Sequence, residues 1–318
     1  MTKIYNFQNM PQAPAVFYGG DAGAKDAIIF DNAVWMVKYP KTTRDLTNPQ
    51  LSYTTSPLSE YLGSKIYESF GLPVHETLLG IRRNKVVVAC NDFTREVVDP
   101  TVGKSVVKRQ LIPFHDLKNS FMSSDTDSYS GSGSETLLTE VLATLSGQTD
   151  LASIPGAKER FWQMFVIDAF IGNNDRNNGN WGILIGDTDV TLAPVYDNGN
   201  AFFNKRSIAQ MEKRIKDKNL IAQDAYQTLT CAYKYKGLDN EGHRINPFVF
   251  IASGDNPDCT NAVRWFMENV NMSEILGIID GIPESFDGFA VMPEIQKAFY
   301  KELLAVRYNK IAEDSLVI

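Results

Sequence analysis

The sequence has few of the residues that build disulfide frameworks or metal clusters. Its three cysteines are an odd number without any short paired spacing, which argues against a disulfide scaffold and against a zinc site. The three histidines, His75, His115 and His243, are scattered along the chain. We expect each histidine to be a surface or loop residue rather than a ligand, and we expect a reducing, cytoplasmic location.

Long apolar runs and an excess of basic charge are also missing. No apolar run approaches the ~20 residues of a membrane span, and the N-terminus lacks the apolar core of a secretory signal. The formal net charge of −7 does not favour nonspecific binding to nucleic acid. We therefore expect neither membrane association nor direct nucleic-acid binding. A length of 318 residues exceeds the usual single core, so we expect one two-lobed unit or two domains.

The chain is organised around one stretch, residues 165–200. An apolar helix, predicted over 158–171, stops at Gly172, where glycine adopts a left-handed backbone without steric cost. A loop rich in asparagine and aspartate follows. Two short apolar runs, 181–185 and 190–195, then predict a β-hairpin.

Three side chains of this stretch have the spacing of a phosphoryl-transfer site. Asp175 and Asn180 lie in the polar loop, and Asp197 follows the hairpin. Asparagine and aspartate are common in loops because they tolerate turns, but a protein-kinase-like fold presents a catalytic aspartate and two metal ligands in this order. Carboxylate and amide oxygens are the hard ligands that Mg²⁺ prefers. The trio therefore predicts kinase-like chemistry.

The N-terminal part of the chain predicts a small sheet lobe. A hairpin with strands over 27–30 and 34–37 turns at Asp31 and Asn32. Lys38 ends this hairpin, either as an ordinary edge residue or as the phosphate-binding lysine of a kinase-like lobe. A glycine-bearing turn precedes it, and such turns either bring backbone N–H groups close to phosphates or simply reverse the chain. The glycines of this turn are Gly19, Gly20 and Gly23.

A well-marked helix is predicted over 56–70, with Ser56 as its N-cap and Pro57 as its first helical residue. Glu60, placed in the first turn, either complements the helix dipole or holds Lys38 toward nucleotide phosphates.

A second hairpin, over 77–81 and 85–90, runs into an exit from the sheet. The exit is either an ordinary strand end or the hinge of a two-lobed kinase, whose backbone binds the adenine edge. The predicted hinge residues are Val88, Ala89, Cys90, Asn91, Asp92 and Phe93.

The rest of the chain is mostly helical. We expect a flexible Ser-rich loop over 120–134, because its residues have little to bury. It is either a plain insertion or a phosphoacceptor or substrate-docking loop. Ser134 is predicted to cap a helix over 135–145. The fold class is α+β, with a small β-rich, nucleotide-binding lobe at 1–93 and a larger, mostly helical catalytic lobe at 94–318. Further helices are predicted over 207–217, 261–269 and 290–311.

With these elements placed, the chain resembles the HipA-like bacterial serine/threonine kinases, especially short members that lack the extra N-terminal subdomain. The resembling segments are Trp35–Lys38, Ser59–Tyr61, Val87–Phe93, Gly172–Gly182 and Ala193–Asp197. The resemblance implies a kinase that uses ATP and Mg²⁺, with Asp175 as the catalytic residue and Lys38, paired with Glu60, on the phosphates. Asn180 and Asp197 would be the Mg²⁺ ligands.

The same resemblance implies partners. Family members include toxins of toxin–antitoxin pairs, so a protein substrate such as an aminoacyl-tRNA synthetase or another translation factor is expected, together with an antitoxin partner. Two features depart from the family pattern. The glycine-bearing turn has no serine or threonine for inhibitory autophosphorylation, and Arg176-Asn177 replaces the histidine that is common after the catalytic aspartate.

Two alternatives stay open. The segment Asp175–Asn180 also resembles the catalytic loop of phosphoinositide kinases, so a lipid or small-molecule kinase is one alternative. Net acidity weighs against a lipid substrate. The other alternative is an inactive nucleotide-binding interaction module, which the loss of any one catalytic residue would have favoured.

Overall fold

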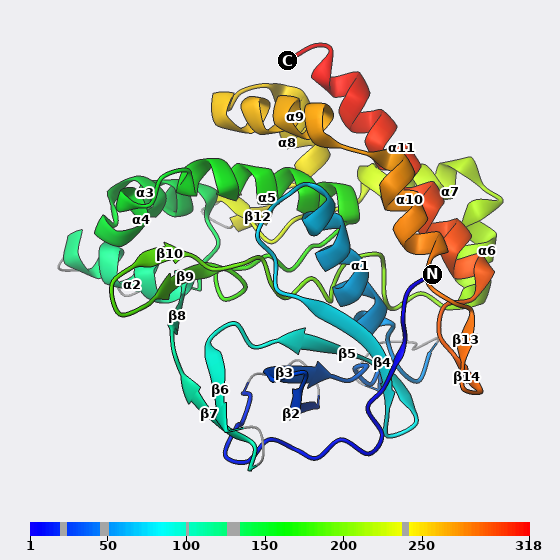
Figure 1. Ribbon diagram of the computed structural model, residues 1–318. Coiled ribbons are helices and arrows are strands. Elements are labelled where there is room, and N and C mark those ends of the chain that lie inside the picture. Colours follow the sequence, from blue (N-terminus) through cyan, green and yellow to red (C-terminus); the bar gives the residue numbers. More distant parts are fainter. Residues whose placement is uncertain (20–23, 45–50, 100–101, 126–133, 237–241) are drawn as a thin grey trace. The chain divides into compact units, whose positions relative to one another are not determined.

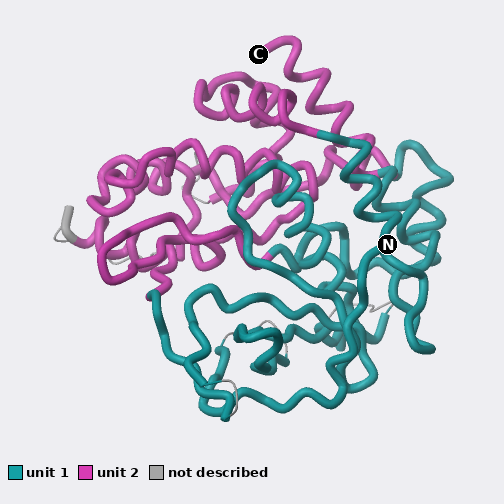
Figure 2. Tube along the Cα trace, viewed as in Figure 1, with its two compact units in different colours: residues 1–109, 198–220, 271–302 teal, residues 110–197, 221–270, 303–318 magenta. Residues whose placement is uncertain are grey.

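The computed structural model describes the chain (Figure 1) except for residues 20–23, 45–50, 100–101, 126–133 and 237–241. The described residues form two compact units that interleave along the sequence (Figure 2). The predicted division into lobes at residue 93 stays a prediction, because interleaved units do not test a single boundary. The first unit comprises residues 1–109, 198–220 and 271–302, and the second comprises residues 110–197, 221–270 and 303–318.

The first unit is built on a five-stranded sheet with the order β1-β4-β5-β3-β2 (Figure 1). β1 runs parallel to β4, and the other neighbouring pairs are antiparallel. The hairpins turn at Asp31–Asn32 and Arg83–Asn84, where positive φ angles match the twist of the flanking strands. Both predicted hairpins are confirmed. The strands are β1 (Tyr5–Asn6), β2 (Lys25–Phe30), β3 (Ala33–Lys38), β4 (Thr77–Arg82) and β5 (Lys85–Asn91).

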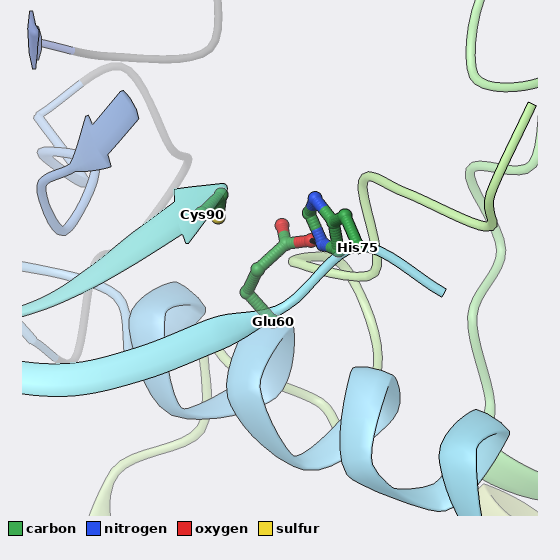
Figure 3. Close-up of side chains that lie close together, drawn as sticks. All are labelled: Glu60, His75 and Cys90. Atoms are coloured by element: carbon green, nitrogen blue, oxygen red, sulfur yellow. Dashed lines mark hydrogen bonds and ion pairs between the residues drawn. The ribbon is translucent and has the colours of Figure 1, made fainter. Parts of the chain in front are cut away.

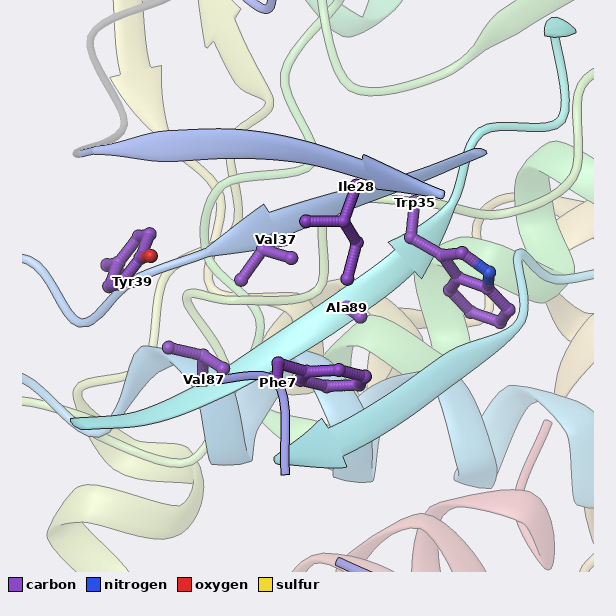
Figure 4. Packing of buried hydrophobic residues seen from close by; sticks show 7 residues of the cluster. All are labelled: Phe7, Ile28, Trp35, Val37, Tyr39, Val87 and Ala89. Atoms are coloured by element: carbon purple, nitrogen blue, oxygen red, sulfur yellow. The ribbon is translucent and has the colours of Figure 1, made fainter. Parts of the chain in front are cut away.

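Strand alternation decides which side chains reach each face of this sheet. An apolar cluster covers one face, and Figure 4 shows its buried members: Phe7, Ile28, Trp35, Val37, Tyr39, Val87 and Ala89. Lys38 follows Val37 in β3, so it points to the opposite face. Helix α1 (Ser56–Ser69) packs on β4 and β5. The period of the strand thus presents Lys38 to the helix that carries Glu60.

The start of α1 differs from the prediction. The N-cap position is Thr55, and its hydroxyl lies 3.3 Å from the carbonyl oxygen of Asn204. The assignment of Ser56 as the N-cap is therefore wrong. Glu60 is the fifth residue of α1 and lies beyond the first turn, which removes the helix dipole as the reason for its presence.

The remainder of the first unit consists of short elements. α10 (Met272–Asp280) packs on α1, and α6 (Ile208–Ile215) begins at a capping box formed by Ser207 and Gln210. Two short hairpins are β6 (Arg95–Asp99) with β7 (Lys104–Val107) and β13 (Ser285–Phe286) with β14 (Phe289–Ala290). Two helices, α7 (Lys218–Ala222) and α11 (Glu294–Ser315), contribute residues to both units.

The second unit is organised around α5 (Ala157–Ile171), which is buried along most of its length. It packs against α3, α8 and α9. A three-stranded antiparallel sheet has the order β10-β9-β8. The predicted hairpin is confirmed, although its second strand is shorter than expected. The strands are β8 (Gln110–Pro113), β9 (Gly182–Ile185) and β10 (Val190–Leu192).

The other elements of the second unit are α2 (Phe114–Asp125), α3 (Leu138–Gly147), α4 (Thr149–Ser153), the π-helix η1 (Gln223–Gln227), β11 (Lys234–Lys236), β12 (Gly242–Arg244), α8 (Pro247–Ser253) and α9 (Pro257–Asn269). Together the two units confirm the α+β class. Within the described residues, every helix is too short or too polar to cross a lipid bilayer.

Two expectations for the middle of the chain are wrong. α2 extends to Asp125, so the first part of the predicted Ser-rich loop is helical, and residues 126–133 lie outside the described residues. α3 begins at Leu138, after the predicted start at residue 135 and its predicted cap at Ser134. The cause is tertiary: Leu137 forms a β-bridge with Lys234, and the hydroxyl of Thr136 donates to the carbonyl of Ala232 at 2.8 Å.

Candidate active site

The loop that carries Asp175 begins at a helix end that requires glycine. Gly172, with a φ of +71°, ends α5, and a Cβ there would lie 2.4 Å from the guanidinium of Arg307. Arg307 belongs to α11, and its Nε and Nη1 donate to the carbonyls of Ala225 and Phe170 at 2.9 and 3.3 Å. Burial lowers the pKa of Arg307 to about 9. A buried cation thus fixes the carboxyl end of α5, where the helix dipole favours positive charge.

Asp175 is half-buried and is held by side chains of its own loop. Asn177 donates from Nδ2 to Oδ1 of Asp175 at 3.0 Å, and its own Oδ1 accepts from the N–H of Gly179 at 2.8 Å. Asn180 donates from Nδ2 to the carbonyl of Asp175 at 2.7 Å. This leaves Oδ1 as the atom with which Asn180 can ligate a hard cation. The loop thus orients both the carboxylate and the amide oxygen that the sequence assigns to catalysis.

Arg176 connects this loop to its surroundings. Its Nε and Nη2 donate to the two carboxylate oxygens of Asp168 at 2.9 and 3.2 Å, a bidentate pair. Its Nη1 donates to the carbonyls of Asn180, at 3.0 Å, and of Tyr196. Asp168 also accepts from Nδ2 of Asn173 at 3.1 Å. One buried guanidinium therefore holds α5, the loop of Asp175 and the residue before Asp197.

Asp197 lies beyond β10 in a backbone conformation that is uncommon outside glycine. Its φ is +61°, a value that aspartate and asparagine adopt more readily than other side chains. Such strained backbone is concentrated at functional sites. The hydroxyl of Tyr196, the preceding residue, donates to the carbonyl of Gly179 at 3.0 Å. Tyr196 thus links the position of Asp197 to the loop of Asp175 and Asn180.

A second group of predicted residues lies in the first unit. Nζ of Lys38 is 2.8 Å from Oε2 of Glu60, and the two side chains are 13% and 1% exposed. Burial raises the pKa of Glu60, but the ion pair with Lys38 and the hydrogen bond from His75 outweigh it and hold the pKa well below its ordinary value. The predicted pair of Lys38 with Glu60 is confirmed. Its role toward phosphates stays a prediction.

Glu60 has two further neighbours with metal-ligating atoms, His75 and Cys90 (Figure 3). All three are buried, and their ligand atoms lie within 4.8 Å of one another. Carboxylate, imidazole and thiolate are all zinc ligands. However, Glu60 already accepts hydrogen bonds from Lys38, His75 and the N–H of Asn198. A metal would have to displace these donors, so we interpret the cluster as a hydrogen-bond network.

His75 agrees with the expectation of a surface or loop residue, but it is buried. It lies in a loop, as predicted, but it is only 4% exposed. Its Nε2 contacts Oε1 of Glu60 at 3.0 Å and the hydroxyl of Ser64 at 3.2 Å.

The predicted glycine-bearing turn is only partly described. Gly20 and Gly23 lie outside the described residues. The carbonyl of Gly19 accepts from Nζ of Lys25 at 2.7 Å, and the hydroxyl of Tyr18 donates to Asp92 at 2.7 Å. Tyr18 therefore ties the start of the turn to the predicted hinge.

The predicted hinge begins within β5, the central strand of the sheet, and continues past its end. Val88, Ala89 and Cys90 lie in β5 between β3 and β4, so their backbone groups are engaged on both sides. The N–H groups of Asn91 and Asp92 donate to carbonyls at 2.9 and 2.8 Å. The assignment of Val88–Phe93 to adenine binding stays a prediction.

The structure thus assembles two groups of predicted residues, each within one unit. Lys38 and Glu60 pair directly in the first unit. Asp175 and Asn180 bond directly in the second, and Asp197 is linked to them through Tyr196. The sequence did not reveal that His75, Asp168, Arg176 and Asn177 position these residues. A lone aspartate in the apolar helix was the available signal for Asp168.

The chain is similar to proteins of known function. It matches the HipA-like C-terminal domain over residues 22–244. The serine/threonine-protein kinase CtkA of Helicobacter pylori is 32% identical over 302 residues, which cover 94% of this chain and 84% of CtkA. The crystal structure of a Helicobacter pylori proinflammatory kinase CtkA matches with a TM-score of 0.82 and 29% identity, over 99% of this chain and 97% of that one.

A more distant structure supports the fold alone. HipA of Shewanella oneidensis MR-1, from a toxin–antitoxin system solved as a complex of HipA, HipB and operator DNA, matches with a TM-score of 0.55 and 12% identity. The match covers 96% of this chain and 70% of that one. From the family match and the similarity to CtkA, the chain belongs to the HipA-like C-terminal domain family.

Proposed function

We propose that this chain is an ATP- and Mg²⁺-dependent serine/threonine protein kinase. The observation that carries the proposal is the hydrogen-bonded loop in which Asn177 and Asn180 hold the carboxylate and the carbonyl of Asp175. The buried pair of Lys38 with Glu60 adds support. So does 32% identity to a serine/threonine-protein kinase across most of the chain.

In the proposed reaction, Asp175 orients the attacking hydroxyl and accepts its proton. The hydrogen bond from Asn177 fixes the rotamer of Asp175 for this task. Lys38 contacts the nucleotide phosphates, and Glu60 keeps the lysine in place. Oδ1 of Asn180 and the carboxylate of Asp197 would hold Mg²⁺. When bound, the cation neutralises charge on the phosphates.

The proposal includes a substrate class and a partner. The acceptor is a serine or threonine hydroxyl of a protein, such as an aminoacyl-tRNA synthetase or another translation factor, or of the chain itself. The Shewanella HipA structure holds HipB, so an antitoxin-like partner is part of the proposal. The three cysteines are free and buried, in keeping with the proposed cytoplasmic location.

The test compares the wild type with Asp175→Ala and Asp187→Ala. Asp187 is an exposed carboxylate in the turn between β9 and β10, so Asp187→Ala controls for the loss of an acidic side chain. Each protein is incubated with Mg²⁺ and ATP and its intact mass is measured. We expect a gain of phosphate on the wild type and on Asp187→Ala only. Unchanged phosphate gain in a folded Asp175→Ala protein would contradict the proposal.

A wild type that gains no phosphate is tested further with a panel of proteins from the translation machinery and by calorimetry with Mg·ATP. Transfer to a panel protein would support the kinase and name its substrate. Neither transfer nor binding would favour an inactive interaction module.

A further inference from the structure

A buried hydrogen-bond network surrounds Glu60. Oε2 accepts from Nζ of Lys38 at 2.8 Å, and Oε1 accepts from the backbone N–H of Asn198 at 2.9 Å. Nε2 of His75 lies 3.0 Å from the same Oε1. Because a carboxylate can only accept, Nε2 of His75 must carry the proton of this bond. Glu60 thus receives one donor from β3, one from a loop and one from the residue after Asp197.

Ser64 closes the network. It lies one helical turn after Glu60, on the same face of α1. Its hydroxyl oxygen is 3.2 Å from Nε2 of His75 and accepts from Nδ2 of Asn198 at 3.1 Å. Asn198 is therefore held twice, by its backbone through Glu60 and by its side chain through Ser64. Ser64, His75 and Asn198 are 1%, 4% and 0% exposed, so water does not compete for these bonds.

The chain beyond Asn198 follows the same helix. The hydroxyl of Ser59 donates to the carbonyl of Ala201 at 2.9 Å, and the N–H of Thr55 donates to the carbonyl of Asn204 at 2.8 Å. A Cβ at Gly199 would lie 3.1 Å from Oε2 of Glu60. The segment 198–204 therefore rests on α1 along the turns that contain Glu60.

From these contacts we infer that His75 and Ser64 are positioning residues that couple Lys38 to the segment 198–204 through Glu60. His75 and Ser64 fix one rotamer of Glu60. In that rotamer one oxygen holds Lys38 and the other holds the amide of Asn198. Loss of the imidazole frees Glu60 to turn, and both partners then lose their fixed acceptor together. The coupling is a property of the folded first unit. Its contribution to phosphoryl transfer rests on the proposed function.

Two readouts that need no nucleotide test the coupling at its two ends. The first is hydrogen–deuterium exchange at the amide of Asn198, and the second is the rate at which an amine-acylating reagent modifies Lys38. His75→Phe keeps a ring in the site but removes both hydrogen bonds. We expect both rates to rise on the order of tenfold, the change that corresponds to one lost hydrogen bond.

Control variants separate this effect from a general loss of structure. His243→Phe makes the same substitution at an exposed position in β12 and should leave both rates unchanged. His75→Gln restores a donor toward Glu60 and should return both rates toward the wild type. Ser64→Ala is the milder variant, and it decides the question if His75→Phe does not fold. Expressed as free energies, the effect of the double variant should be smaller than the sum of the two single effects, because both residues act on one carboxylate.

The outcomes are distinct. Unchanged rates at both ends in folded His75→Phe, or a rise at only one end, would overturn the coupling. If transfer is found, kcat should fall about tenfold in His75→Phe while KM for ATP changes less, since misplacement of Lys38 affects the transition state most. If both rates rise in a protein that neither binds nor uses ATP, the coupling stands and the proposed function fails.

Discussion

Each unit buries an ion pair at or beside its predicted site residues, and the two pairs are built differently. In the second unit, the side chains of Arg176 and Asp168 are 2% and 5% exposed. In the first unit, Lys38 is 13% exposed against 1% for Glu60. The guanidinium of Arg176 donates to one carboxylate and two backbone carbonyls. The ammonium of Lys38 sits on a flexible stem at a less closed position.

The different cations of the two pairs indicate different roles. A planar guanidinium with donors in a fixed fork is suited to hold backbone segments in register, whereas an ammonium is a point charge suited to reach a phosphate. We interpret the pair of Arg176 with Asp168 as a support for the loop of Asp175. We interpret the pair of Lys38 with Glu60 as a support for a ligand.

The largest stability effect is expected at Arg176. Arg176→Met leaves the carboxylate of Asp168 buried without its cation, which should lower the free energy of unfolding by about 3–5 kcal/mol. Arg264→Met, an exposed arginine of α9, is the control and should change it by less than ~0.5 kcal/mol. Denaturant titration measures both. Equal losses of unfolding free energy in the two variants would contradict a structural role for the pair of Arg176 with Asp168.

Substitutions at three glycines test why the loop of Asp175 begins at Gly172. Gly172 and Gly71 both have a φ of +71°, but only at Gly172 does a buried guanidinium meet the added Cβ. Gly71→Ala should cost roughly 1–2 kcal/mol for the left-handed backbone alone, and Gly172→Ala should cost more. Gly277 lies in helix α10 with open space where a Cβ would be, so Gly277→Ala should raise the free energy of unfolding by about 0.5–1 kcal/mol. Denaturant titrations that give Gly172→Ala and Gly71→Ala the same loss of unfolding free energy would contradict the role of Arg307.

The dependence of the unfolding free energy on pH under acidic conditions tests the pair of Lys38 with Glu60. The pKa of Glu60 is lowered in the folded chain from an ordinary value of 4.5, so below about pH 4.5 the unfolded chain takes up a proton that the folded chain does not. The free energy of unfolding should therefore fall as the pH drops below this value. Glu60→Gln should flatten that fall, and Glu68→Gln, exposed on the same helix, should not. Denaturant titrations at several pH values measure the slopes, and equal slopes for all three proteins would contradict a charged Glu60.

A modest effect on phosphoryl transfer is expected at Asn177. Asn177→Ala removes the hydrogen bond to the carboxylate of Asp175 and should lower the phosphoryl-transfer rate about tenfold, the equivalent of one hydrogen bond. The melting temperature should change little, because Asp175 is half-buried and water replaces the lost donor. Asn119→Ala, exposed on α2, is the control. An unchanged rate in Asn177→Ala would show that the loop does not need this side chain.

Local patterns were sufficient to predict much of the fold and part of the site. The two hairpins of the first unit and the helix that ends at Gly172 depend on residues within a few positions of each other. The pair of Lys38 with Glu60 followed from the order of strand and helix in a kinase-like lobe. The hairpins and the helix end are encoded within short segments, so periodicity and turn chemistry reveal them, whereas the pair was inferred from the order of elements in a kinase-like lobe.

The missed features depend on contacts between distant segments. α3 starts late because Thr136 and Leu137 bond to the chain near Ala232 and Lys234. The role of Arg176 depends on Tyr196, and the contacts of His75 depend on Glu60 and Ser64. No sequence period marks such a residue, because its partners are brought to it only by the fold.

The most direct test of this division of roles measures Lys38→Met beside Arg176→Met, with both unfolding and phosphoryl transfer from Mg·ATP as readouts. Lys38→Met should fold, because His75 and the amide of Asn198 still donate to Glu60. Its transfer rate should fall by more than about a hundredfold, which is the order expected for a lost electrostatic contact to the reacting group. Arg176→Met should show the larger loss of unfolding free energy. A Lys38→Met protein that keeps the wild-type transfer rate while losing as much stability as Arg176→Met would contradict the account.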